Sequence, residues 1–184
     1  MRDQLCKLNS RRRILSTNGI HVETERKFLI LMPDPEELKK LPGCVCTRIS
    51  QTYLLSDDGV TERVRKRVYP DRTVYTHTIK RRISPMSSVE DENELSFEEY
   101  HLLKQRKDPK KHKIKKQRFV IPYQGHVIEI DVYPFWQKQA VMEIELGSES
   151  ESVDLPPFVT VLREVTGDKS YSNNSMSRKI PAED

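Results

Sequence analysis

The chain has 184 residues, 33% of them charged, and a formal net charge of +4. This length suffices for one domain with a substantial core, and short apolar runs throughout argue against disorder of the whole chain. The small basic excess does not establish a nucleic-acid partner, and we expect none. No apolar run is long enough for a transmembrane helix, so we expect no membrane partner either.

The three cysteines, Cys6, Cys44 and Cys46, have neither the spacing of a disulfide framework nor that of a zinc site. Reduced thiols are typical of the cytoplasm, which is the compartment we expect. The first 20 residues are basic and include the run 11–13 of three arginines. We expect residues 1–20 to be a flexible extension, residues 21–175 to form one domain, and residues 176–184 to be a polar tail.

Strand signals dominate the chain. Alternating side chains bounded by turn residues predict strands at 22–32, 47–55, 60–69, 73–83, 90–95, 115–123, 126–133 and 140–146. The turn signals are 57–59, 70–71 and 124–125, and residues 84–89 are expected to be a loop. About eight consecutive strands with few helices predict a mainly β (α+β) fold, in which an antiparallel sheet curls or closes into a barrel.

Three segments have helical signals. Residues 35–41 follow Asp34, a possible N-cap, and end before a Pro-Gly pair. Ser96 and Glu99 have the spacing of a capping box, which predicts a helix to about residue 105. Residues 156–165 are expected to form a last helix.

Charged residues alternate along the first predicted strand. Glu23, Glu25 and Lys27 share one face because successive side chains of a strand point to opposite faces. The same spacing recurs at Arg63 and Arg65, Lys80 and Arg82, Glu92 and Glu94, Lys116 and Arg118, Glu129 and Asp131, and Glu143 and Glu145. The residues between them are often apolar. These patterns predict a barrel that is polar inside and apolar outside, with room for one small ligand.

The residue types indicate what such an interior would bind. Carboxylates are hard oxygen ligands suited to Mg²⁺ or Mn²⁺. Arginine and lysine hold phosphate oxygens, arginine in a bidentate manner. A metal together with a polyanion such as a linear triphosphate would satisfy both sets. The alternative is that each pair lies on a solvated face, where ion pairs contribute little. The recurrence of the pattern is what favours an interior site.

The run 23–27, Glu-Thr-Glu-Arg-Lys, resembles the E-x-E-x-K strand of the CYTH family, the triphosphate tunnel metalloenzymes. Further segments resemble that family's motifs in the same order, at 51–54, 62–65, 78–80, 92–94, 129–133, 143–146 and 164–173. The form of the first strand is most similar to the short bacterial inorganic triphosphatases. The His-Phe pair that is frequent upstream in the family's cyclases is missing.

The resemblance implies an eight-stranded antiparallel tunnel that holds a triphosphate with one or two Mg²⁺ or Mn²⁺ ions. The implied metal ligands are Glu23, Glu25, Glu143 and Glu145. The implied catalytic residues are Lys27, Glu129 and Asp131. The implied phosphate-binding residues are Lys27, Arg63, Arg65, Lys80, Arg82, Lys116, Arg118 and Lys169, with Glu92 and Glu94 as additional tunnel acids.

The expected activity is metal-dependent hydrolysis of inorganic tripolyphosphate to pyrophosphate and phosphate, by a monomer or homodimer. Alternatives on the same fold are a nucleoside or thiamine triphosphatase and a class IV-type adenylyl cyclase. An alternative of another kind is a non-catalytic module that binds polyphosphate or nucleic acid. Residues 104–118 contain nine lysines or arginines, which could be a solvated face, a funnel for polyphosphate or a nucleic-acid patch.

Overall fold

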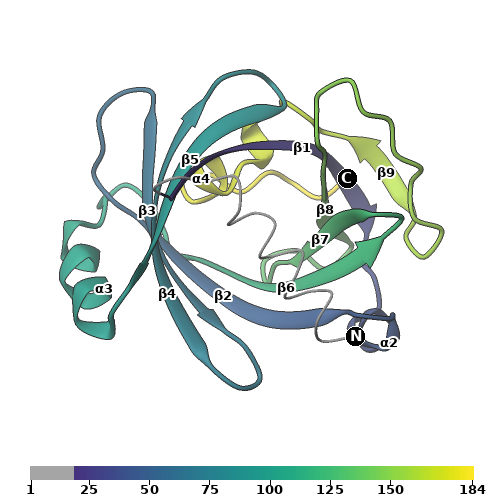
Figure 1. Cartoon of the computed structure of the whole chain (residues 1–184), viewed down its shortest axis with the longest axis horizontal. Coiled ribbons are helices and arrows are strands. Elements are labelled where there is room, and N and C mark those ends of the chain that lie inside the picture. Colours follow the sequence, from purple (N-terminus) through teal and green to yellow (C-terminus); the bar gives the residue numbers. More distant parts are fainter. Residues whose placement is uncertain (1–18) are drawn as a thin grey trace.

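The computed structural model describes residues 19–184, so the predicted N-terminal extension lies outside the described residues except for its last two. Nine antiparallel strands make up most of the protein (Figure 1). They are β1 (Ile20–Leu31), β2 (Val45–Tyr53), β3 (Val60–Val68), β4 (Thr73–Arg82), β5 (Ser87–Leu95), β6 (Ile114–Tyr123), β7 (His126–Val132), β8 (Gln139–Glu145) and β9 (Val161–Glu164).

Eight of these strands close into a barrel. Their order is β5-β4-β3-β2-β6-β7-β8-β1, and β1 pairs with β5 to complete the ring. The first part of β1, residues 20–24, pairs with β5, whereas residues 25–31 pair with β8. Past Ser87, the first residue of β5, the short strand β9 pairs with residues 28–30 of β1. The predicted mainly β, antiparallel, closed fold is therefore confirmed.

Short helices lie around the barrel. They are the α-helices α2 (Pro35–Lys40), α3 (Phe97–Leu103) and α4 (Asn173–Met176), and the 3-10 helices η2 (Lys104–Arg106) and η3 (Lys169–Tyr171). The two predicted N-caps are confirmed: Asp34 accepts a hydrogen bond from the backbone N–H of Glu36, and Ser96 forms a capping box with Glu99. Among residues 19–184, none of the helices has the length and hydropathy that a membrane span requires.

The helix predicted at 156–165 is wrong. A turn at residues 156–159 leads into β9, whose backbone pairs with β1. The backbone of β1 needs partners beyond the start of β5, and strand pairing there outweighs the local helix signal. The predicted loop at 84–89 is also too long, since β5 begins at Ser87 and pairs with both β1 and β4.

The outer face of the barrel is apolar where other segments cover it. Phe28 and Ile30 of β1 pack with side chains of β6, β7 and β8, and Leu38 of α2 lies over them. On the other side, α3 covers β3 and β4 (Figure 1), where Tyr100 packs on Leu54 and Val64. These contacts confirm the prediction of apolar side chains outside.

The inner face changes character along the barrel. Leu29, on the same face of β1 as Glu25 and Lys27, belongs to an apolar cluster at one end. The inward residues of this cluster are Leu29, Tyr53, Ile114, Tyr133 and Val141. Tyr171 of η3 and Met176 of α4 pack against them. The C-terminal segment therefore fills this end of the barrel with apolar side chains, and the charged residues occupy the remainder.

Residues after α4 remain in contact with the barrel. The indole N–H of Trp136 donates to the carbonyl of Pro181, and Glu183 accepts hydrogen bonds from the backbone N–H groups of Gln137 and Lys138. Arg163 of β9 contacts the carboxylate of Asp184. The polar tail thus follows the end of the barrel that the apolar cluster fills.

Leu29→Ala tests whether the apolar cluster stabilises the fold. Leu29 has no exposed surface, so truncation should lower the free energy of unfolding by about 2–5 kcal/mol. Leu31→Ala is the matched control on the same face of β1, because Leu31 is 47% exposed, and it should cost under about 1 kcal/mol. Urea denaturation measures both. Equal losses of stability would contradict the placement of the cluster.

Candidate active site

Basic side chains gather on one half of the barrel wall. Arg63 and Arg65 come from β3, Lys80 from β4, and Lys116 and Arg118 from β6. Strand β2 lies between β3 and β6 and contributes a polar group, Thr47, whose hydroxyl accepts a hydrogen bond from Arg67 at 3.1 Å. The half of the wall formed by β4, β3, β2 and β6 is called the basic wall below.

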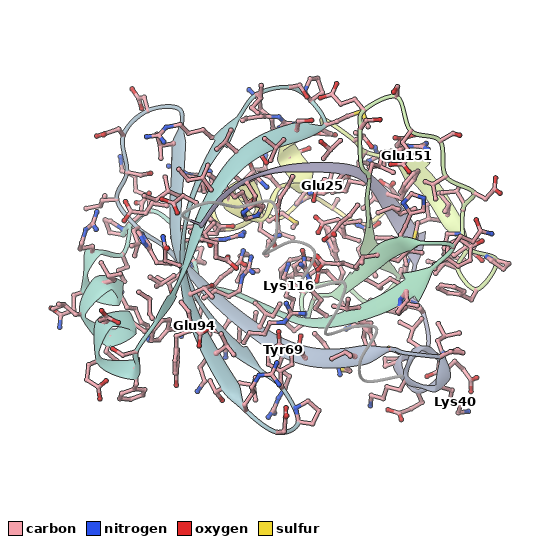
Figure 2. All side chains as sticks on the ribbon, in the orientation of Figure 1. Glu25, Lys40, Tyr69, Glu94, Lys116 and Glu151 are labelled. Atoms are coloured by element: carbon pink, nitrogen blue, oxygen red, sulfur yellow. The ribbon has the colours of Figure 1, made fainter. Side chains whose placement is uncertain are left out.

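Acidic side chains gather on the opposite half, formed by β7, β8, β1 and β5 and called the acidic wall below. Its acids are Glu129 and Asp131, Glu143 and Glu145, Glu23 and Glu25, and Glu90 and Glu92. Strand register places Glu25 opposite Glu145 and Lys27 opposite Glu143. Lys27 is thus a basic residue within the acidic wall. Figure 2 shows Glu25 and Lys116 within the ring of strands and Lys40 outside it.

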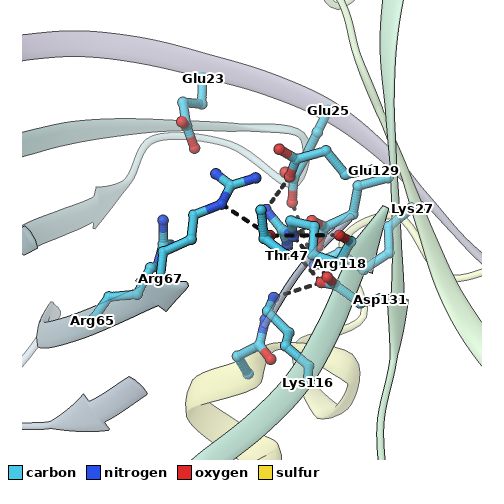
Figure 3. Close-up of polar contacts among 12 residues, drawn as sticks. Glu23, Glu25, Lys27, Thr47, Arg65, Arg67, Lys116, Arg118, Glu129 and Asp131 are labelled. Carbon is cyan, nitrogen blue, oxygen red and sulfur yellow. Dashed lines mark hydrogen bonds and ion pairs between the residues drawn. The ribbon is translucent and has the colours of Figure 1, made fainter. Parts of the chain in front are cut away.

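The two walls meet first between β6 and β7. The guanidinium of Arg118 donates two hydrogen bonds of 2.6 Å to Asp131, contacts Glu129 and lies 3.1 Å from Glu143 (Figure 3). Asp131 also accepts a bond from Lys116. Burial disfavours its negative charge, but the cations of Arg118 and Lys116 prevail and lower the pKa of Asp131.

This arrangement disfavours the positive charge of Lys116. It is buried beside Arg118, and burial followed by the neighbouring guanidinium lowers the pKa of Lys116 to about 8, despite its contact with Asp131. The phenol of Tyr133 lies 3.5 Å from Asp131 and donates to Asn173 just after η3, at 2.8 Å. The charged network therefore touches the apolar end of the barrel at Tyr133.

The second meeting point lies between β4 and β5. Glu90 contacts Lys80 and lies 3.4 Å from Arg63, while Lys80 also lies 3.7 Å from Glu23. Burial opposes the charge of Glu90, but Arg63 and Lys80 outweigh it and lower the pKa of Glu90. Nearby, Arg65 lies 3.6 Å from Glu92, which accepts a 2.6 Å bond from Thr78.

Midway along the acidic wall, negative charge accumulates. The ammonium of Lys27 lies 2.8 Å from Glu143 and 3.3 Å from Glu25. Burial opposes its charge, but Glu143 and Glu25 outweigh burial and raise the pKa of Lys27. Even so, burial and the neighbouring Glu143 raise the pKa of Glu25. One ammonium group therefore does not fully compensate these carboxylates.

Midway along the basic wall, the opposite condition holds. Burial, followed by the neighbouring Arg63, lowers the pKa of Arg65 below its ordinary value. The Nε–H groups of Arg63 and Arg65 are both buried and have no hydrogen-bond partner among residues 19–184. Buried donors are normally satisfied, so these two N–H groups mark a place where an acceptor fits.

The acidic wall offers carboxylate ligands for a divalent cation. Glu25, Glu143 and Glu145 occupy adjacent register positions of β1 and β8, and burial followed by the neighbouring Glu143 raises the pKa of Glu25. Carboxylate oxygens are the donors that Mg²⁺ and Mn²⁺ prefer. Within the described residues, ligand atoms of His21, Glu23 and Glu90 also lie within 4.8 Å of one another. Lys80 contacts Glu23 and Glu90, just as Lys27 contacts Glu25 and Glu143, so a cation at either group would compete with a lysine.

Three predicted residues lie outside this network. Arg82, Glu94 and Lys169 are exposed, and Arg82 donates to the carbonyls of Ser84 and Pro85 in the loop before β5. Arg82 and Lys169 instead line a surface cleft of about 410 Å³. Arg82 has the right alternation, but it lies at the end of β4, where the turn offers its guanidinium nearer acceptors.

Sequence reasoning missed Glu90, Arg67 and His21. Glu90 and Arg67 each continue a recognised i, i+2 row by one step, so extending the rows would have found them. His21 also lies two residues before Glu23, and its ring lies 3.2 Å from that carboxylate. The hydrogen bond to Glu23, which outweighs partial burial, raises the pKa of His21.

The fold is that of known proteins, although no family model and no curated protein matches the chain by sequence. The crystal structure of the inorganic triphosphatase NE1496 aligns with a TM-score of 0.55 at 25% identity, covering 87% of this chain and 97% of that one. PH1819 from Pyrococcus horikoshii OT3 aligns with a TM-score of 0.53 at 17% identity, over 68% and 80% of the two chains. The chain thus has the CYTH-like triphosphate tunnel fold.

Lys116 should make the protein more stable as the pH rises above about 8. Below about pH 8 both the folded and the unfolded chain hold its proton, and the penalty of the buried charge is fully present. As pH rises above 8, only the folded chain releases the proton, so this penalty fades up to the unfolded pKa near 10.4. Relative to Lys116→Met, the wild-type protein should gain on the order of 1–3 kcal/mol between these limits.

Urea denaturation of both proteins at several pH values checks this gain. Comparison with Lys116→Met removes the contributions of other groups that titrate in the same range. A difference between the two proteins that stays constant from pH 7.5 to 10 would show that Lys116 is not held with a lowered pKa.

Proposed function

We propose that the protein hydrolyses a linear triphosphate, inorganic tripolyphosphate, inside the barrel in a reaction that depends on Mg²⁺ or Mn²⁺. One observation carries the proposal. Unsatisfied guanidinium N–H groups of Arg63 and Arg65 face a wall on which Glu25 has a raised pKa. A polyanion against the first wall and a cation against the second would relieve both. The structural likeness to an inorganic triphosphatase supports the choice of substrate.

The basic wall would bind the phosphates. Arg63 and Arg65 offer buried N–H groups, and guanidinium groups bind phosphate oxygens with two parallel hydrogen bonds. Lys80, Lys116 and Arg118 extend this surface along the barrel. Lys80 and Arg118 already contact acids, so they would exchange part of those contacts for phosphate oxygens when the substrate enters.

The acidic wall would hold the metal ion through Glu23, Glu25, Glu143 and Glu145. When bound, such an ion would neutralise charge on phosphate oxygens and lower the pKa of a coordinated water. The residues around it have separate tasks. Lys27, 2.8 Å from Glu143, keeps that carboxylate ionised and in place, because its ammonium lowers the pKa of Glu143 against the effect of burial.

Hydrolysis needs an oriented water and stabilisation of the charge on the leaving phosphate. The lone pairs of Asp131 already accept bonds from Arg118 and Lys116, so Asp131 is a positioning residue for these two cations. Among residues 19–184, Arg118 is the one ion-pair partner of Glu129, and we propose that this carboxylate orients the attacking water. Arg118 and Lys27 would stabilise the developing charge.

The substrate proposed here is a small molecule. The compartment proposed is the cytoplasm, with which the two free thiols among the described residues, Cys44 and Cys46, agree. A nucleoside triphosphatase, a thiamine triphosphatase or a cyclase would in addition need groups that recognise the organic part of the substrate. The side chains identified inside the barrel are of the types that bind phosphate and cations, which is why inorganic tripolyphosphate is the substrate proposed.

Phosphate release tests the proposal, with tripolyphosphate, ATP and thiamine triphosphate compared in Mg²⁺, Mn²⁺ and EDTA. We expect turnover of tripolyphosphate to exceed that of the other two, and EDTA to abolish it. Glu143→Gln should reduce turnover by roughly 10²-fold or more, as when one group that stabilises transition-state charge is removed. Glu37→Gln, on the exposed surface of α2, is the control with the same chemical change and should retain full activity.

Calorimetric binding of tripolyphosphate to Glu143→Gln separates an enzyme from a binding module. An enzyme should lose turnover while it still binds the anion. Absence of turnover by the wild-type protein in either metal, together with unchanged anion binding in EDTA, would instead identify a non-catalytic polyanion binder.

A further inference from the structure

A second gathering of basic side chains lies on the outside of the barrel. Around the start of β6, alternate residues face opposite sides of the sheet. Lys116 and Arg118 point inward and are buried, whereas Lys113 and Lys115 are exposed. The basic segment 104–118 therefore divides into an inner part, which belongs to the candidate active site, and an outer part that the proposed hydrolysis does not use.

Strand register aligns the outer part across three strands. Lys115 lies opposite Ser50 of β2, and Ser50 lies opposite Lys66 of β3. Lys107 pairs with Leu54, which follows β2 and packs on the outer face beneath Tyr100. Directly paired residues share a face, so Lys107 continues the same surface. The name basic face is used below for Lys66, Lys104, Lys107, Lys113 and Lys115.

The charge of the basic face is uncompensated. Within residues 19–184, no ion pair links any of its five lysines to an acid. Two acids near it are already engaged, because Glu62 contacts Arg106 and His77, and Asp108 contacts Lys111 and Arg178. Partial burial and the charges of Lys104, Lys115 and Lys107 lower the pKa of Lys113, which agrees with their proximity.

Aromatic rings border this face on helix α3. Phe97 is 54% exposed, and its ring lies 4.3 Å from that of His101, one helical turn further along. Tyr75 supports Phe97 from β4 with an edge contact at 5.8 Å. The ammonium of Lys104 lies 5.7 Å above the ring of Tyr100. The exposed rings are those of Phe97 and His101, and Lys104 of the basic face follows His101 by three residues.

We propose that the basic face and the rings of Phe97 and His101 together bind single-stranded nucleic acid. Uncompensated lysines attract a phosphate backbone, and exposed aromatic rings stack with unpaired bases. Inorganic polyphosphate would use the lysines but has no bases for the rings. Net charge gave no hint of this surface, because it averages over the whole chain and hides a local excess.

The surface is independent of the proposed hydrolysis, since its side chains lie outside the barrel. A fluorescent oligonucleotide of about 12 unpaired nucleotides with a 5′-hydroxyl is a suitable probe, because it has no terminal phosphates for the interior. Anisotropy measured between about 50 and 200 mM salt reports both the affinity and the number of phosphates that the protein neutralises.

The double variant Lys113→Glu/Lys115→Glu should weaken binding at least tenfold. The slope of log affinity against log salt should become shallower by about 0.7 for each phosphate that the variant no longer neutralises. The matched control is Lys39→Glu/Lys40→Glu on α2, which makes the same change of charge at exposed lysines away from the face. It should leave the affinity within about twofold. Residues 1–18 are present in all variants, so any contribution they make is common to them.

Phe97→Ala distinguishes nucleic acid from polyphosphate. The variant should bind the oligonucleotide several-fold more weakly, as expected when one base no longer stacks on a ring, and should bind long-chain polyphosphate unchanged. Three results would overturn the proposal: no oligonucleotide binding at about 50 mM salt, equal weakening in both double variants, or no effect of Phe97→Ala on the oligonucleotide. The last result would identify the surface as a polyphosphate site.

Discussion

Separation of charge across the barrel is the constraint on which the rest of the site depends. Acids occupy β7, β8, β1 and β5, and bases occupy β4, β3 and β6. Apart from Lys27 of β1, which contacts Glu143 and Glu25, the opposite charges of the two walls meet near the places where the walls adjoin, at Arg118 with Asp131 and at Lys80 with Glu90. Midway along each wall, residues of like charge are neighbours, and the opposite charges near them do not fully offset them. Burial, together with a neighbouring like charge, lowers the pKa of Arg65 and raises the pKa of Glu25.

Such an interior costs stability, which apolar contacts elsewhere must offset. Burying a charged group is unfavourable unless it is paired and its hydrogen bonds are made. The Nε–H groups of Arg63 and Arg65 are buried without a hydrogen-bond partner among the described residues. The outer core around Phe28 and Ile30 and the inner cluster around Leu29 and Tyr171 supply the compensation. The inner cluster has a second effect, because it fills one end of the barrel and confines the charged side chains to the remainder.

Most of the fold followed from local pattern. Alternation of charged and apolar residues set both the strands and their inward faces, since a one-residue shift would have reversed every side chain. Glu25, Lys27, Arg118 and Asp131 were identified in this way, and the structure brings them together.

The failures arose where long-range contacts decided the outcome. Segment 156–165 has helical signals, but part of it forms β9, which pairs with the free edge of β1. Arg82 continues the row of Lys80, yet its position beside a turn gives it carbonyl partners outside the barrel. Which charges pair and which remain in excess depends on the order of the strands around the ring. That order brings together residues far apart in the chain, such as Lys27 and Glu143.

Ligand-induced stabilisation of Arg65→Met tests the separation of charge most directly, measured as the shift of Tm on adding tripolyphosphate and Mg²⁺. Arg65 is only partly compensated in the free protein, because burial and Arg63 lower its pKa although Glu92 lies 3.6 Å away. Its replacement should therefore leave the Tm of the free protein nearly unchanged. The shift caused by tripolyphosphate should then largely disappear. A free protein that is markedly less stable, with an undiminished shift, would contradict the account.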